Sequence, residues 1–152
     1  MPFSLILFRD IVGVFRVKDP ILLERLTRDI AVFSPERFTY SGLSERLGVD
    51  RETLKLYLYY LTSSMLISIA DVYTRSGKAA EKREMKLYFC EEGLRKALTL
   101  DMDNGRSAEN VVAWHLIKGG YGPKVFLSRI TGKRSTRLIL STRIPQSSFR
   151  LR

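Results

Sequence analysis

YSGLSERLGVDRETLKLYLYYLTSSMLI, from Tyr40 to Ile67, is the stretch that decides the fold of this chain. It predicts a short helix from Gly42 to Leu47 that ends at Gly48, because glycine adopts the left-handed conformation that ends helices. Asp50 is expected to cap a second helix, since its carboxylate accepts free N–H groups and suits the positive helix end. Apolar residues at helical spacing turn both helices toward one core, which is the pattern of a helix-turn-helix: Leu43, Leu47, Val49, Leu54, Leu58 and Leu61.

Composition and charge limit the classes of protein to consider. With 152 residues and 45% hydrophobic residues the chain is long enough to bury a core. The net charge of +10 is uneven, since residues 1–117 hold 17 basic and 16 acidic residues, whereas residues 118–152 hold 9 basic residues and no acid. Net charge alone therefore does not establish DNA binding by the helix-turn-helix.

The cysteine count and the opening segment indicate a compartment. Cys90 is the only cysteine and His115 the only histidine, which excludes an intramolecular disulfide and a thiolate or imidazole metal site. The opening MPFSLILF is short and has no basic flank, so it is expected to pack as a strand or first helical turn and not to cross a membrane. A reducing, cytoplasmic setting is predicted.

The segments around the central stretch predict a winged helix. Asp19 and Pro20 begin a supporting helix that ends at Ser34-Pro35, which completes a three-helix unit. Strand-forming residues follow at 66–73 and 85–90, and two strands after a helix-turn-helix make a wing. The polar connection between the strands carries four cations that are expected to reach a phosphate backbone: Arg75, Lys78, Lys82 and Arg83. An ordinary solvated hairpin remains the alternative.

Two more helices and a turn are expected downstream. The first helix runs over residues 91–98, and residues 101–106 are interpreted as a loop. Ser107 is expected to cap the second helix, whose apolar side holds or adjoins Val111, Val112, His115 and Leu116. GGYGPK, residues 119–124, follows a helix and precedes a strand-like segment, an order that indicates a turn and not a phosphate-binding loop.

The second helix of the motif is the candidate nucleic-acid interface. Its four candidate contacts share a face turned away from the leucines: Arg51, Glu52, Lys55 and Tyr59. Ser44 and Arg46 on the preceding helix are expected to touch phosphates. The competing interpretation is a protein interaction module, because Leu56, Tyr57, Tyr59 and Tyr60 make this helix apolar almost all round.

The order of the motifs resembles the C-terminal region of a family of archaeal and bacterial AAA-type P-loop ATPases. Five segments over roughly residues 8–126 carry the resemblance: FRDIV (8–12), KDPILLERL (18–26), GLSERLGVDRETLKLYLYYL (42–61), KLYFCEEGLRKAL (86–98) and AENVVAWHL (108–116). The resemblance implies a winged helix followed by a fold similar to restriction endonucleases, with Glu109 matching a Glu-Asn pair of that family. The ATPase module and the remaining nuclease carboxylates have no counterpart here, so we expect no catalysis, no metal and no cofactor.

The end of the chain departs from that family. TGKRSTRLILSTRIPQSSFRLR, residues 131–152, has no acid and little periodicity. One choice of codons for residues 133–136 encodes Glu-Val-Asp when it is read in a shifted frame. This suggests that the chain is a frameshifted or degraded remnant of a longer ATPase. The alternative is a basic arm that binds nucleic acid.

These observations predict an α+β, mainly helical fold: a winged helix-turn-helix followed by the start of a truncated nuclease-like α/β subdomain. The expected divisions are residues 1–90, 91–130 and a basic tail over 131–152. The expected function is DNA binding without catalytic activity, with double-stranded DNA as the partner. One alternative is a stand-alone transcriptional regulator, and another is a non-functional remnant. The third is an interaction module, whose partner would be another protein, an ATPase module or a second copy of this chain.

Overall fold

The computed structural model describes residues 5–72, 84–100, 103–119 and 124–125. Its first three helices are the π-helix η1 (Ile6–Val12), α2 (Gly13–Phe15) and α3 (Pro20–Phe33). The opening segment is therefore helical where it is described. At α3 the predicted start is confirmed, because Asp19 Oδ1 accepts the backbone N–H of Leu22 at 2.9 Å and Pro20 is the first helical residue.

The two helices of the central stretch form as α4 (Tyr40–Leu47) and α5 (Arg51–Ser63). The predicted start of α4 at Gly42 was wrong by two residues, because the Thr39 hydroxyl accepts the Gly42 N–H and caps the helix earlier. The predicted glycine stop and aspartate cap are confirmed. Gly48 has a φ of +63°, and Asp50 Oδ1 accepts the Thr53 N–H at 2.9 Å.

A small, mainly antiparallel sheet packs beside these helices. Its strands are β1 (Arg37–Phe38), β2 (Ile67–Val72) and β3 (Met85–Phe89), in the order β1-β3-β2, and the two-residue strand β4 (Lys124–Val125) pairs in parallel with β2. The register of the hairpin pairs Ile67 with Phe89 and Asp71 with Met85. All side chains of β3 are buried, which agrees with helices packed around this central strand.

Two helices complete the described chain, α6 (Glu92–Thr99) and α7 (Asn104–Lys118). Two sequence predictions were wrong here. The residues 104–106 are helical and not a loop, because Asp103, not Ser107, caps α7 by accepting the N–H groups of Gly105 and Arg106. The side with Val111, Val112 and His115 is exposed. Instead, α7 buries Asn110 and Ala113 against the sheet and Ser107 beside Arg95 of α6.

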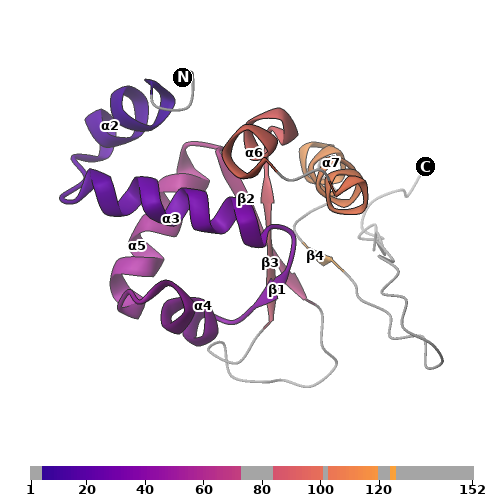
Figure 1. Ribbon diagram of the computed structural model, residues 1–152, viewed down its shortest axis with the longest axis horizontal. Coiled ribbons are helices and arrows are strands. Elements are labelled where there is room, and N and C mark those ends of the chain that lie inside the picture. The colour runs from indigo at the N-terminus through magenta and orange to yellow at the C-terminus, as the bar shows by residue number, and fades with distance from the viewer. Residues whose placement is uncertain (1–4, 73–83, 101–102, 120–123, 126–152) are drawn as a thin grey trace, which may run out of the picture.

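The core lies between the helices and one side of the sheet. Figure 1 shows α3 crossing the molecule, with α4 and α5 to one side of the strands and α7 to the other. Leucines and isoleucines of α3, α4, α5 and β2 fill the space between these elements, together with Phe89 of β3. The fold is α+β and mainly helical, with a three-stranded antiparallel sheet.

Candidate nucleic-acid interface

The turn between α4 and α5 is built from local hydrogen bonds. Gly48 takes the left-handed conformation, and its N–H and that of Val49 donate to carbonyls in the last turn of α4. The Ser44 hydroxyl donates to the carbonyl of Val49. Ser44 is therefore half-buried and engaged within the turn, not pointed freely at solvent.

Asp50 caps the start of α5 and places a negative charge there. Side-chain and backbone hydrogen bonds from Thr53 lower the pKa of the exposed Asp50 carboxyl. The carboxylate form is thus the one that caps the helix at neutral pH. This cap determines the direction in which α5 leaves the turn.

The outward face of α5 carries the four predicted contacts. Leu54, Leu58 and Leu61 point into the core. The predicted contacts are all exposed: Glu52 and Tyr59 lie on the side away from the leucines, and Arg51 and Lys55 lie on one flank of the helix. Lys55 Nζ lies 2.8 Å from Glu52 Oε1. This pair is exposed, so it contributes little to stability and costs little to break.

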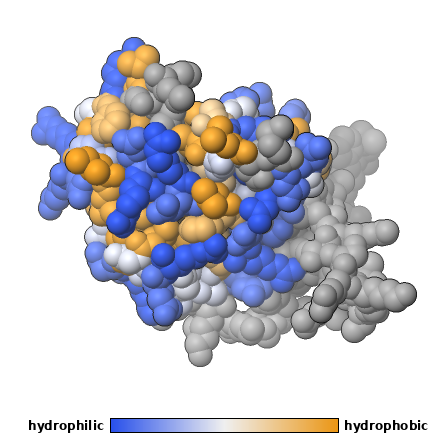
Figure 2. Space-filling view, viewed as in Figure 1, coloured by the Kyte–Doolittle hydropathy of each residue, from blue (hydrophilic) through white to orange (hydrophobic). Residues whose placement is uncertain are grey.

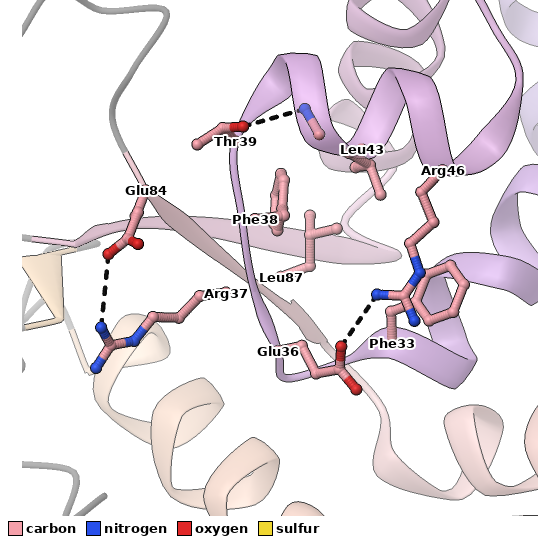
Figure 3. A pocket seen from close by; sticks show the side chains of 10 residues that line it. Phe33, Glu36, Arg37, Phe38, Thr39, Leu43, Arg46, Glu84 and Leu87 are labelled. Atoms are coloured by element: carbon pink, nitrogen blue, oxygen red, sulfur yellow. Dashed lines mark hydrogen bonds and ion pairs between the residues drawn. The ribbon is translucent and has the colours of Figure 1, made fainter.

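Arg46 lies apart from the cations of α5, against Phe33 and Glu36. Its guanidinium lies 3.3 Å from the centre of the Phe33 ring and donates to Glu36 Oε2 at 3.1 Å (Figure 3). Glu36 also accepts from Arg106 of α7 through its other oxygen, at 3.1 Å. Arg46 therefore connects α4 to the end of α3 and is not gathered with the α5 cations.

A small cavity lies beside Arg46. It has a volume of about 320 Å³ and an apolar floor made by Phe38, Leu43 and Leu87 (Figure 3). Arg37 stands at its rim, 3.5 Å from Glu84. Each arginine at this cavity faces a glutamate, so the rim carries no excess positive charge in the described residues.

The N-terminal helices reach the flank of α5, which sequence reasoning missed. The Phe15 ring stacks on Tyr60 with centroids 4.9 Å apart and meets Tyr59 edge-on at 6.1 Å. Beside them Leu56 is 44% exposed and Tyr59 is 59% exposed. The local sequence contained no signal for this contact, because it joins residues more than forty positions apart.

The antiparallel hairpin of β2 and β3 directly follows α5 along the chain. Its four predicted cations, Arg75, Lys78, Lys82 and Arg83, lie outside the described residues. The candidate interface within the described residues therefore consists of α5 and the elements that contact it.

On the other side of the sheet a polar cluster joins α7 to β3. Lys86 donates to Glu109 Oε1, and the Tyr88 hydroxyl donates to the same oxygen at 3.2 Å. Burial is the main reason that the pKa of Tyr88 is raised. Within the described ranges no three His, Cys, Asp or Glu side chains gather in a way that would hold a metal ion.

A shallow pocket of about 520 Å³ lies next to this cluster, lined in part by Cys90, Trp114 and His115. Burial raises the pKa of the Cys90 thiol to about 12, which makes it a poor nucleophile. Trp114 is half-buried, and His115 Nδ1 lies 2.9 Å from the carbonyl oxygen of Val111. This arrangement provides no activated nucleophile.

Comparison with known proteins identifies a family whose function is unknown. The sequence model of a family described as "Domain of unknown function (DUF8612)" matches residues 3–105, more than half of the chain. No curated protein and no solved structure matches. None of the helices in the described residues is both long and apolar enough to span a bilayer.

Proposed function

The chain belongs to the DUF8612 family, whose function is unknown, and we propose from its own surface that it is a winged-helix DNA-binding domain. In this proposal α5 enters the major groove and the β2–β3 hairpin is the wing. The domain itself has no catalytic role.

The order of the elements supports this proposal. Along the chain α3, β1, α4, α5, β2 and β3 follow one another, and β1 adds to the hairpin beside β3. A winged helix has this order: a first helix, a short strand, the two helices of the helix-turn-helix, and then a two-stranded hairpin. A recognition helix of that kind presents side chains from its first turns to the base edges.

The observation that carries the proposal is the outward face of α5. Arg51 and Lys55 lie one turn apart on its first half, both exposed on one flank of the helix. Their exposure lets them reach phosphates, and the exposed pair between Lys55 and Glu52 costs little to exchange for a DNA contact.

The test is a fluorescence titration of the full chain with a mixed-sequence duplex at several salt concentrations. We expect Arg51→Ala with Lys55→Ala to weaken binding. The slope of the salt dependence should fall by on the order of 0.9 for each phosphate that the variant no longer neutralises. An unchanged titration would exclude this face.

The basic tail needs its own control, because clustered cations bind any duplex. In this variant six cations are changed to glutamine: Lys133, Arg134, Arg137, Arg143, Arg150 and Arg152. Retained binding assigns the activity to α5. If the tail variant loses all binding, the tail is the nucleic-acid-binding element and the proposal for α5 is wrong.

A second candidate function is protein binding through the same helix. The exposed Leu56 and Tyr59 favour it, since apolar side chains in the middle of a solvent-facing helix are typical of interfaces. Light scattering on the chain and on Leu56→Ser with Tyr59→Ser separates the two functions. Self-association that the double variant abolishes, with no DNA binding by the parent chain, favours this candidate.

The resemblance to the ATPase C-terminal region adds a proposed origin and partner. We infer that this chain derives from such a protein and that a P-loop ATPase module is its natural neighbour. The polar contacts of Glu109 with Lys86 and Tyr88 support the absence of nuclease chemistry, because this carboxylate is already engaged. Sequencing the locus tests the origin: adjacent frames without homologous continuation would contradict it.

A further inference from the structure

We propose that Arg16 and Lys18, in the turn between α2 and α3, form a second phosphate-binding element beside α5. This inference rests on the proposed DNA-binding function and names contacts outside the helix-turn-helix and its hairpin. Its ligand is the phosphate backbone of the strand opposite the one that Arg51 and Lys55 contact.

The two ends of this turn are fixed against α5. At one end the Phe15 ring stacks on Tyr60 at a centroid distance of 4.9 Å. At the other end the Tyr57 hydroxyl donates to the backbone carbonyl of Asp19 at 3.3 Å. Arg16 and Lys18 lie between these two anchors, so their backbone is held along this flank of α5.

The cations of the turn are available for a ligand. Both side chains are exposed, and in the described part of the chain neither has a hydrogen-bond or ion-pair partner. Figure 2 shows hydrophilic side chains projecting at the left edge of the molecule, where Figure 1 places the turn between α2 and α3. The nearest acid in sequence, Asp19, caps α3 through its carboxylate, so the turn keeps a positive excess.

Helix geometry places this turn across α5 from the first pair of cations. With 3.6 residues per turn, Arg51 and Lys55 lie roughly 140–180° around the α5 axis from Tyr60. The exposed ridge between these flanks holds Glu52, Leu56 and Tyr59. The turn is seated on the Tyr60 flank, so positive charge stands on both sides of the ridge.

This arrangement matches the dimensions of duplex DNA. A helix is about 10–12 Å wide and the major groove is about 12 Å wide, so a helix that enters the groove has one phosphate backbone along each flank. Arg51 and Lys55 suit one backbone, and Arg16 and Lys18 suit the other. Cations on both flanks would fix how α5 is oriented in the groove, which is the role of phosphate contacts.

The experiment titrates the full chain and its variants with a fluorescent mixed-sequence duplex at several salt concentrations. Arg16→Gln with Lys18→Gln is compared with a control of equal charge change, Lys96→Gln with Lys118→Gln, on α6 and α7. We expect the salt slope of the first variant to fall by about 1.8, or roughly 0.9 for each cation removed from a phosphate, and that of the control to fall much less.

A third variant separates binding from folding. Arg16 has a φ of +50°, a conformation that glycine adopts more easily, so Arg16→Gly should raise the melting temperature while weakening DNA binding. Weaker binding by a more stable protein cannot be a folding defect.

The outcomes distinguish this inference from the proposed function. If the parent chain binds no DNA, the proposed function fails and this inference fails with it. If Arg51→Ala with Lys55→Ala weakens binding but the Arg16 and Lys18 variants behave as the control does, α5 is the interface and this inference alone is overturned.

Discussion

Gly48 connects α4 to α5 with a φ of +63°, and no atom lies within 4 Å of the position where a Cβ would stand. The requirement for glycine is therefore one of backbone conformation and not of space. We expect Gly48→Ala to lower the free energy of unfolding by about 1 kcal/mol, the cost of a left-handed L-residue. Urea denaturation followed by circular dichroism measures it.

Gly13 is the matched control for that change. It is exposed, has a φ of −64° and likewise has nothing within 4 Å of its Cβ position. Alanine is favoured over glycine in a helix, so Gly13→Ala should raise the free energy of unfolding by roughly 0.5–1 kcal/mol. Equal effects at the two positions would contradict the conformational explanation.

Capping residues show how far single residues can be predicted from sequence. Asp19 and Asp50 stand directly before strong helical patterns, and both were predicted correctly as caps. Thr39 and Asp103 were missed for a physical reason. Several polar residues near each helix start can accept an N–H, and the tertiary packing of the helix decides which of them does.

Among the elements, α7 is the one whose orientation the sequence misrepresents. The side expected to be buried, with Val111 and Val112, faces solvent, whereas the buried side joins β3 through Asn110 and packs Ala113 and Ile117 near Tyr88. Hydrophobic periodicity predicts such a face poorly, since its buried positions mix the polar Ser107 and Asn110 with Ala113, while valines stand on the exposed side.

Asn110 provides the test of that attachment. It is fully buried, its Oδ1 accepts the Phe89 N–H at 2.8 Å and its Nδ2 donates to the Phe89 carbonyl at 2.9 Å. We expect Asn110→Leu to lower the free energy of unfolding by about 2–4 kcal/mol, because two buried backbone groups lose their partners. The exposed neighbour change Val111→Ser should alter it by less than about 0.5 kcal/mol in urea denaturation. A small effect of Asn110→Leu would show that water replaces both bonds.

For the whole molecule, the contacts around the boundary expected at residue 90 bear on how the chain unfolds. Arg106 of α7 donates to the Val32 carbonyl and to Glu36, and α6 packs on α3. These contacts tie both C-terminal helices to the helical unit that holds α5. We therefore expect the described elements to unfold in one cooperative transition.

Cys90 reports on that transition, because it lies where β3 leads into α6. Burial raises the pKa of its thiol to about 12, so at pH 8 the folded protein should react with iodoacetamide on the order of a thousandfold more slowly than an ordinary thiol. In a urea series, the labelling of Cys90 should rise at the same midpoint as the loss of helical circular dichroism, and Cys90→Ser is the control for background labelling. If labelling begins at lower urea than the loss of α3, α4 and α5, then α6 and α7 detach first and the chain folds as two units that divide near residue 90.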